Sequence, residues 1–337
     1  MRFGLALPHY DTSLSGSPAS FKGVAAVAAR AEAAGFDSLW ISDHLFLDWS
    51  KYGGPPDKQG SLEAWTTLAA LAGVTSRVRL GTLTLCNDLR NPALLAKMAA
   101  TLDLLCAGRL ELGLGAGWYA PEYTAAGIEL DEPGVRIARV GEAASVVARL
   151  LDGEELTHHG RFYDIDGAIC RPGPHQTPRP AIWIGGKGDY LLKMVARHAD
   201  GWNFSWLGDT ETYRQRLEVC EHICESEGRE RPLRRSVGAY VLAGSDDADV
   251  ARRFERLVSV TPPGVLSEAS GAGAVSFESF RATRVAGTVA EVTDRFGELA
   301  ALGVEEVIVT LGALPFQLSD VEDIDLLGAE VLPALRG

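Results

Sequence analysis

The chain has 337 residues, of which 46 % are hydrophobic and 23 % charged, so it can bury a large core and is not a disordered protein. Its 45 acidic and 32 basic residues give a net charge of −13, which argues against binding to nucleic acid or to an anionic membrane surface. An anionic small molecule is not excluded, because a ligand responds to the charges around its own site.

The cysteines and the first residues of the sequence bear on the cellular compartment in which we expect the protein. The five cysteines are odd in number and scattered, so we expect no disulfide framework and no metal centre. Residues 3–7 read directly as a strand, without the apolar stretch and cleavage site of a signal peptide, and no apolar run reaches the roughly 18 residues of a membrane helix. The sequence therefore predicts a cytoplasmic protein.

Short apolar strands alternate with amphipathic helices along the first half of the chain. Ser20 is a suitable N-cap for the first helix, which Gly35 ends, and Asn91 followed by Pro92 opens a later helix. The predicted strands are residues 3–7, 38–42, 78–85 and 110–114, and the predicted helices are residues 21–34, 61–75, 92–105 and 135–151.

The alternation is interrupted twice in the second half. Residues 153–180 contain Gly-Arg-Phe-Tyr and Pro-Gly-Pro, which predicts a hairpin and a loop, and residues 261–284 are rich in Gly, Ser, Ala and Pro, which predicts a long loop. Thr288 and Glu291 form a capping box that opens a helix. The other predicted strands are 181–184, 202–205, 237–243 and 305–311, and the other helices are 189–198, 210–227, 250–260 and 320–335.

Eight strands, nearly all followed by a helix, predict the fold. Near-continuous apolar strands are buried on both faces, which is typical of a parallel sheet. We expect an α/β protein with a (β/α)8 TIM barrel, with insertions before strand five and before the last helix–strand unit. The whole chain, residues 1–337, then forms a single domain. An open doubly wound sheet is the alternative, and it is disfavoured because no boundary separates two halves.

In such a barrel the functional residues lie at the carboxyl ends of the strands. The second strand ends in Asp43 and His44, which would place an imidazole in the barrel mouth as an acid or base. His9 follows the first strand and is as consistent with a structural role as with a functional one. The third strand ends in small and hydroxylated residues that suit the close approach of a planar ring, although ordinary strand alternation explains them better when they are taken alone. The fourth runs into a Gly-rich segment whose aromatic residues would either wall a pocket or pack under a loop. These two segments contribute Thr82, Leu83, Thr84 and Cys86, and then Gly115, Gly117, Trp118, Tyr119 and Tyr123.

The fifth strand ends in Gly185, Gly186, Lys187 and Gly188, directly before a helix. Free N–H groups at a helix N-terminus bind anions, and a lysine adds positive charge. We interpret this segment as a phosphate-binding loop, although a tight glycine turn would have the same sequence. It is not a Walker loop, and the G-x-S-x-G and H-E-x-x-H patterns of serine hydrolases and zinc proteases are absent from the sequence.

Taken together, these segments resemble the bacterial-luciferase-like family of flavin- and deazaflavin-dependent oxidoreductases. The resemblance runs from about residue 1 to 330, and the order of its parts is more specific than any single part. The matching segments are Ser38-Leu-Trp-Ile-Ser-Asp-His44, Arg79-Leu-Gly-Thr82, Asn91-Pro92, Gly108-Arg-Leu-Glu-Leu-Gly-Leu-Gly-Ala-Gly-Trp118 with Glu122-Tyr123, Trp183-Ile-Gly-Gly186 and Asp200-Gly-Trp-Asn203.

The resemblance implies a cofactor and a mechanism. The Ser-Asp-His and Gly-Ala-Gly-Trp forms look most like the branch that uses coenzyme F420, an 8-hydroxy-5-deazaflavin. His44 would then lie near the reactive ring carbon, Asp43 near the ring or its ribityl chain, and a non-prolyl cis peptide near Leu83–Thr84 would back the ring. Some deazaflavin-dependent relatives carry Glu at the position of Trp118, so a second acid is not expected there.

The leading hypothesis is an F420-dependent oxidoreductase that transfers a hydride between the deazaflavin ring and a small organic substrate, with His44 as proton donor or acceptor. The alternative is an FMN-dependent monooxygenase that uses oxygen and takes reduced flavin from a partner reductase. A non-catalytic flavin binder and a phosphosugar enzyme on the same barrel are weaker alternatives. The resemblance also implies a homodimer.

Overall fold

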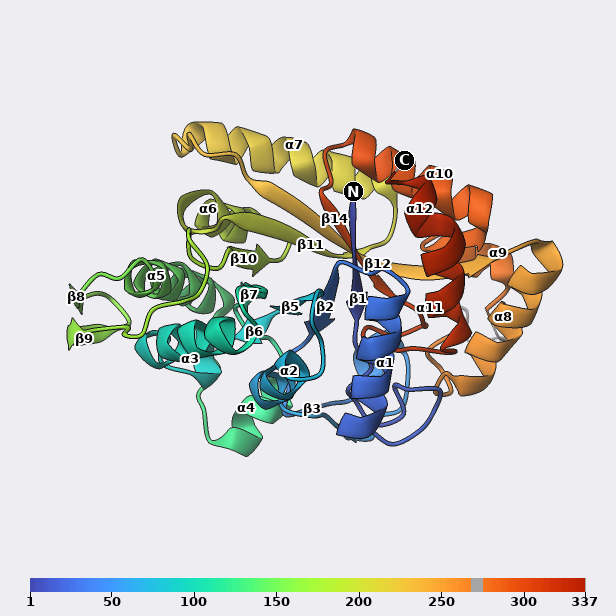
Figure 1. Ribbon diagram of the computed structural model, residues 1–337, viewed down its shortest axis with the longest axis horizontal. Helices are drawn as coiled ribbons and strands as arrows, with labels where there is room; N and C mark the ends of the chain where they lie inside the picture. Colours follow the sequence, from blue (N-terminus) through green and yellow to red (C-terminus); the bar gives the residue numbers. More distant parts are fainter. Residues whose placement is uncertain (268–274, 337) are drawn as a thin grey trace.

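The computed structural model describes residues 1–267 and 275–336, and within them eight parallel strands close into a barrel (Figure 1). β1 lies between β14 and β2, and β10 pairs with β7 to close the ring. The predicted TIM barrel is confirmed. Its strands are β1 (Arg2–Ala6), β2 (Ser38–Ile41), β5 (Arg79–Thr82), β7 (Leu110–Gly115), β10 (Ile182–Gly185), β11 (Gly201–Leu207), β12 (Arg234–Gly244) and β14 (Glu306–Thr310).

The helices surround the barrel and begin at the predicted caps. Ser20 accepts a hydrogen bond from the Gly23 N–H, Asn91 accepts one from Ala93, and Thr288 and Glu291 form both bonds of the capping box. The longer helices are α1 (Phe21–Ala33), α2 (Ala64–Ala72), α3 (Pro92–Leu105), α5 (Pro133–Leu151), α6 (Asp189–His198), α7 (Thr210–Ser226), α8 (Asp247–Val260) and α10 (Val289–Ala301).

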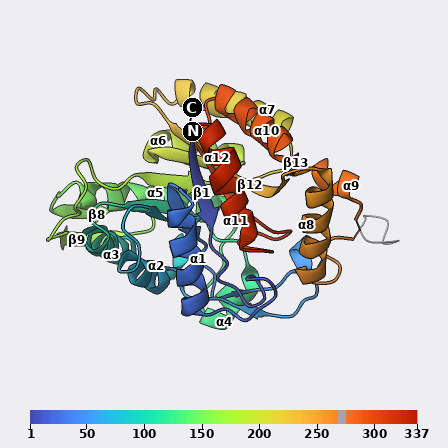
Figure 2. The same cartoon turned by 45° about the vertical axis from the view of Figure 1, so that its right-hand side comes forward.

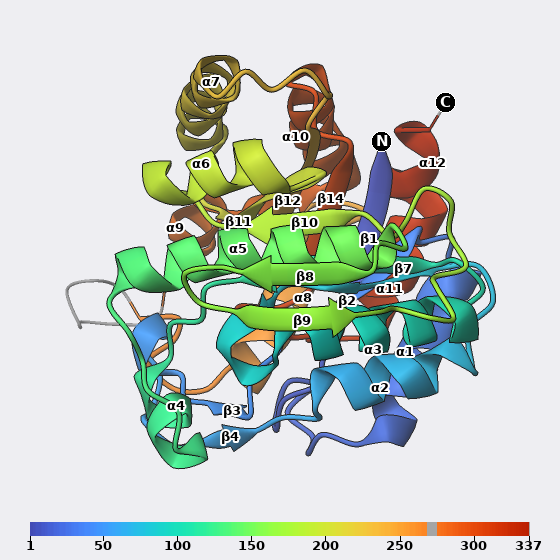
Figure 3. The same ribbon diagram turned by 90° about the vertical axis from the view of Figure 1, so that its left-hand side faces the viewer.

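The two insertions have the predicted places in the chain. The first forms an antiparallel hairpin of β8 (Leu156–His159) and β9 (Asp164–Ala168), which lies beside α5 (Figure 3). The second contains the short helix α9 (Phe277–Arg281) rather than loop alone, and residues 268–274 of the predicted loop lie outside the described residues. Directly after it, β13 (Val285–Thr288) extends the sheet by pairing with β12.

Several short elements were not predicted. They are β3 (Phe46–Leu47) and β4 (Gln59–Gly60), β6 (Leu85–Cys86), α4 (Ala120–Ala126) and the 3-10 turns Ser50–Tyr52 and Asn87–Leu89. The predicted last helix is divided into α11 (Glu322–Leu326), a π turn at Leu327–Val331 and α12 (Leu332–Ala334). Among the described residues, no helix combines the length and apolarity needed to cross a membrane.

The barrel has two distinct ends. Both termini lie at the end where the strands begin (Figures 1 and 2), whereas α4, β3 and β4 lie at the opposite end (Figure 3). At the first end, Trp40 and Trp183 fill the interior because glycines face them. A Cβ on Gly81 would lie 2.4 Å from Trp40 Cε3, and a Cβ on Gly201 would lie 2.2 Å from Trp183 Cε3.

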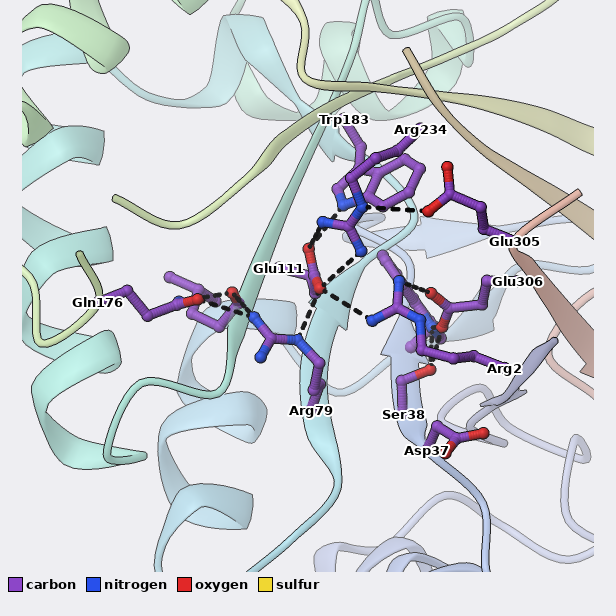
Figure 4. Close-up of polar contacts among 12 residues, drawn as sticks. Arg2, Asp37, Ser38, Arg79, Glu111, Gln176, Trp183, Arg234, Glu305 and Glu306 are labelled. Atoms are coloured by element: carbon purple, nitrogen blue, oxygen red, sulfur yellow. Dashed lines mark hydrogen bonds and ion pairs between the residues drawn. The ribbon is translucent and has the colours of Figure 1, made fainter. Parts of the chain in front are cut away.

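Two carboxylates are buried beside these tryptophans, and we call the group the base cluster: Glu111 and Glu306 with Arg2, Arg79 and Arg234 (Figure 4). Arg79 Nε lies 2.6 Å from Glu111 Oε1, and Arg2 Nη2 lies 2.7 Å from Glu306 Oε2. The tryptophans contribute as well, since the indole N–H of Trp183 donates to Glu111 at 2.7 Å. Buried charge at this end is therefore paired with guanidinium groups and closed off by aromatic rings.

Candidate functional site

A cavity of about 430 Å³ opens at the carboxyl ends of the strands. Ten of the predicted site residues line it, and five do not. Those that line it are Asp43, His44, Leu83, Thr84, Cys86, Gly115, Gly117, Trp118, Gly185 and Gly186, and those behind or beside its wall are Thr82, Tyr119, Tyr123, Lys187 and Gly188.

His44 forms a pair with a buried carboxylate. Its Nδ1 lies 2.9 Å from Glu122 Oε1, and the other oxygen of Glu122 accepts the Leu45 N–H at 3.0 Å. The Glu122 side chain is fully buried, while the imidazole is 14 % exposed and lines the cavity. With Nδ1 directed to the carboxylate, Nε2 is the nitrogen that can exchange a proton with a ligand.

Glu122 was missed as a site residue from the sequence. It belongs to the Glu122-Tyr123 pair within the family-like segment, and that pair was the available signal. It lies on α4, a seven-residue helix that the sequence analysis did not predict. Without that helix, nothing placed its carboxylate beside a residue 78 positions earlier in the chain.

Asp43 has a different environment from that of its neighbour His44. Arg90 donates to both of its oxygens, at 2.6 and 3.2 Å, and the Cys86 N–H donates to it at 3.0 Å. Burial raises the pKa of Asp43, and the bonds from Arg90 oppose that shift. Asp43 thus joins the end of β2 to the segment after β5, and its predicted contact with a ring or ribityl chain stays a prediction.

The segment after β5 forms a close-packed wall. The Leu83–Thr84 peptide bond is cis, as the family resemblance predicted. The Thr82 hydroxyl donates to the Gly113 carbonyl at 2.9 Å and accepts the Gly113 N–H at 2.8 Å. A Cβ on Gly115 would lie 2.1 Å from Thr84 Oγ1, so glycine is required where β7 passes this wall.

Three aromatic residues follow β7, and only Trp118 lines the cavity. The Tyr119 hydroxyl donates to Asp48 at 2.5 Å, and burial raises the Tyr119 pKa to about 12. The Tyr123 hydroxyl donates to Asp88 at 3.0 Å and lies 3.0 Å from Cys86 Sγ. Burial also raises the pKa of Cys86 to about 12, so its thiol is neutral at pH 7.

The predicted phosphate loop lies at the start of α6. Within the described residues, the N–H groups of Lys187 and Gly188 donate no hydrogen bond to the chain, and nothing lies within 4 Å of a Cβ built on Gly188. The Lys187 ammonium donates to the Trp206 carbonyl at 3.0 Å instead of facing the cavity. Arg136, which the sequence analysis missed, lines the cavity nearby and donates to the carbonyls of Ala116 and Gly117.

The loop between β3 and β4 meets the second insertion beside the cavity. Lys51 Nζ lies 3.7 Å from the centre of the Trp118 ring, and Tyr52 lines the cavity. Gly53 and Gly264 both have a left-handed backbone conformation, with φ of 82° and 87°, and their backbones are in direct contact. A Cβ on Gly264 would lie 2.2 Å from the Gly53 carbonyl oxygen, so this crossing admits no side chain.

Three hydrogen-bonded side chains, which follow β1 and β2 in the chain, lie at the same cavity. Tyr10 and Ser42 line it, and their hydroxyl oxygens lie 2.5 Å apart. His9 lies behind them, fully buried, with Nε2 3.1 Å from Ser42 Oγ. Among the described residues, no group of three or more His, Cys, Asp and Glu side chains could hold a metal ion.

A family model described as luciferase-like monooxygenase matches residues 1–307. The chain belongs to this family. A phthiodiolone/phenolphthiodiolone dimycocerosates ketoreductase of Mycobacterium tuberculosis is 31 % identical over 258 residues, which are 72 % of this chain and 66 %, just under two thirds, of that relative. An uncharacterized protein of the same species is 34 % identical over 217 residues, which are 61 % of this chain and 73 % of that protein.

Solved structures agree with the fold over the full length. An F420-dependent secondary alcohol dehydrogenase in complex with an F420-acetone adduct has a TM-score of 0.77 at 23 % identity, covering 100 % of this chain and 99 % of that one. The monooxygenase RslO1 from Streptomyces bottropensis has a TM-score of 0.75 at 25 % identity, covering 99 % of each chain. The family model and the ketoreductase relative are both named for oxidoreductase chemistry.

Proposed function

We propose that the protein is an F420-dependent oxidoreductase that transfers a hydride between the deazaflavin ring and a small organic substrate, with His44 as proton donor or acceptor. The observation that carries the proposal is the pairing of His44 with the buried Glu122 at the wall of the cavity. An imidazole held by a carboxylate on one nitrogen, with the other free, is suited to general acid–base catalysis.

The residues present fit a planar, anionic cofactor. The cis segment Leu83–Thr84 and Gly115 form a wall that a ring can approach closely, because small or backbone atoms face it. The free N–H groups of Lys187 and Gly188 at the start of α6 would bind a phosphate group. Arg136 supplies a cation in the cavity wall.

The protein's share of the chemistry is orientation and proton transfer. A bound deazaflavin supplies or accepts the hydride at its ring carbon. Glu122 holds the Nδ1 proton of His44 and stabilises the imidazolium, so Nε2 gives a proton to a carbonyl oxygen during reduction and takes one from an alcohol during oxidation. The aromatic and aliphatic side chains of the cavity, among them Leu47, Trp206 and Phe316, limit the access of water.

The second candidate is an FMN-dependent monooxygenase, which the similarity to RslO1 and the description of the family favour. It would need reduced flavin, supplied by a reductase partner. The homodimer also stays a proposal, and the exposed Leu94, Leu104 and Leu105 of α3 offer an apolar surface for it.

Cofactor titration separates the two candidates. The cofactor-free protein is titrated with oxidised F420 and, separately, with FMN, while the quenching of tryptophan fluorescence is followed. We expect micromolar or tighter binding of F420 alone, followed by oxidation of reduced F420 when a ketone is added. Tight binding of FMN with oxygen-dependent turnover would instead establish the monooxygenase.

A further inference from the structure

Three hydrogen bonds connect the backbone directly after β1 to the cavity wall. His9 Nδ1 lies 2.8 Å from the Leu7 carbonyl oxygen, His9 Nε2 lies 3.1 Å from Ser42 Oγ, and Ser42 Oγ lies 2.5 Å from the Tyr10 hydroxyl. The side chains are 0 to 4 % exposed, so bulk water does not compete for these bonds.

The direction of each bond follows from the donors and acceptors available. A carbonyl can only accept, so His9 Nδ1 carries the ring proton. Burial lowers the pKa of His9 to about 4, so the ring is neutral at pH 7 and Nε2 is an acceptor. Ser42 therefore donates its hydroxyl proton to His9, and Tyr10 donates its own to Ser42.

This chain of bonds determines what Tyr10 offers to a ligand. A phenol has one proton, and that of Tyr10 is already given to Ser42. Burial raises the Tyr10 pKa well above its ordinary value, so the hydroxyl stays neutral. Tyr10 lines the cavity, and a ligand that reaches its hydroxyl oxygen from there can only donate a hydrogen bond to it, whereas a carbonyl oxygen placed there would meet a lone pair.

Tyr10 and His44 can contact the same small molecule, since their ring centroids are 6.5 Å apart. The two side chains differ in what they offer. His44 Nε2 can donate or accept, according to its protonation, and so suits the oxygen that changes during the reaction. Tyr10 is a fixed acceptor, and it suits a second group of the substrate that carries an O–H or N–H.

We propose that Tyr10, oriented by the positioning residues Ser42 and His9, makes the site selective for substrates with a hydroxyl or amino group next to the reacting carbon. The substrates are α-hydroxy or α-amino ketones and the matching 1,2-diols or amino alcohols. In the reduction the carbonyl carbon gains a hydride, its oxygen gains a proton from His44, and the reduced cofactor is oxidised by two electrons. The reaction rests on the proposed function, whereas the binding preference does not.

The test compares hydroxyacetone with acetone, which lacks the second hydroxyl. We expect Tyr10→Phe to lower the ratio of kcat/KM for hydroxyacetone to that for acetone by about tenfold, mainly through the KM for hydroxyacetone. Ser42→Ala removes the acceptor of the Tyr10 hydroxyl proton. Because Tyr10 can then also donate, this variant should lower the same kcat/KM ratio to a smaller extent. The control is Tyr52→Phe, a cavity tyrosine outside the chain of bonds, which affects both ketones equally.

Binding measured without turnover separates this inference from the proposed function. The affinities of the cofactor-free chain for the two ketones are measured by NMR titration, in the wild type and in Tyr10→Phe. A preference for hydroxyacetone that Tyr10→Phe removes supports the inference even if neither ketone is reduced, in which case the proposed function fails alone. Equal affinities in the wild type, or a preference that survives in Tyr10→Phe, overturn the inference even if both ketones are reduced.

The tautomer of His9 provides an independent check. The nitrogen-15 shifts of His9 should show a neutral ring protonated at Nδ1 from pH 7 down to about 5, since burial keeps its pKa near 4. A ring protonated at Nε2, or charged at pH 7, would reverse the chain of bonds and overturn the role of Tyr10 as an acceptor.

Discussion

The two ends of the barrel each bury carboxylates but pair them differently. In the base cluster, Glu111 and Glu306 face guanidinium groups, which stay charged at every ordinary pH. At the mouth, Glu122 faces His44, whose imidazole lines a cavity and has a second ring nitrogen that can donate or accept a proton. The acid is of the same type in both places, and its partner differs: a guanidinium group at the base and an imidazole at the mouth.

The packing of aromatic side chains also differs between the two ends of the barrel. Trp40 and Trp183 fill the base so completely that the neighbouring strands carry glycine at the positions paired with them. At the mouth the aromatic side chains surround a space of about 430 Å³. Stability and function are therefore segregated along the barrel axis, and substitutions at the two ends should separate them.

The largest effect is expected at His44. His44→Ala should lower the rate of hydride transfer by about 10²–10⁴-fold, because the proton donor is lost, while the free energy of unfolding changes little. Single-turnover oxidation of reduced F420 and thermal unfolding are the measurements, with His222→Ala on the exposed side of α7 as the control. An unchanged rate would remove His44 from the mechanism.

The matching change at the base is Glu111→Gln. Glu111 lies among Arg79, Arg234 and Arg2, so removing its charge leaves guanidinium groups without their partner. We expect a loss of about 3 kcal/mol in the free energy of unfolding, with unaltered cofactor affinity. Denaturant unfolding measures this loss. A loss below about 1 kcal/mol would show that the charge of Glu111 contributes little to the stability of the fold.

A smaller contrast is expected between two glycines. Gly4→Ala at the base brings a Cβ to 2.5 Å from Ser38 Oγ, whereas Gly188→Ala at the mouth has no atom within 4 Å. The first should cost about 1–3 kcal/mol in unfolding free energy and the second less than about 0.5 kcal/mol. If Gly188→Ala weakens cofactor binding at unchanged stability, the start of α6 is in contact with the cofactor.

The smallest effect concerns pH. Burial raises the pKa of Glu306, so its contribution to stability is present below the ordinary glutamate pKa and is lost as the pH rises through the raised value. For Glu111, burial acts in the same direction but Arg79 and Arg234 outweigh it and lower the pKa, so its contribution is lost only as the pH falls. Relative to wild type, Glu306→Gln should therefore gain stability as the pH rises above the ordinary glutamate pKa, and denaturant midpoints measured at a series of rising pH values would detect it.

The barrel was predictable because its signals are local. Helix α6 was predicted to the residue, Thr288 caps α10 as expected, and the cis bond falls at Leu83–Thr84. Each depends on a run of neighbouring residues or on the resemblance to the family. Strand boundaries moved by a few residues, as at β12, which begins at Arg234 rather than Val237, because pairing with β11 extends it.

The site was predictable in place but not in its pairings. His44 was identified from its position at a strand end. Glu122 and Arg90, which bond to His44 and Asp43, and Arg136, which lines the cavity, come from elements distant in sequence. Lys187 was expected to face an anion and instead lies on the Trp206 carbonyl. No periodicity encodes such contacts, because they depend on how the loops fold over one another.

The crossing of Gly53 with Gly264 has a consequence for attempts to alter the protein. The two backbones touch with no room for a Cβ, so the shape of one loop is transmitted directly to the other. Grafting the 261–275 segment of a relative in order to change selectivity will therefore distort the 50–55 turn unless that turn is exchanged with it. The two loops should therefore be exchanged together. Random libraries that vary only one of them will contain few active members.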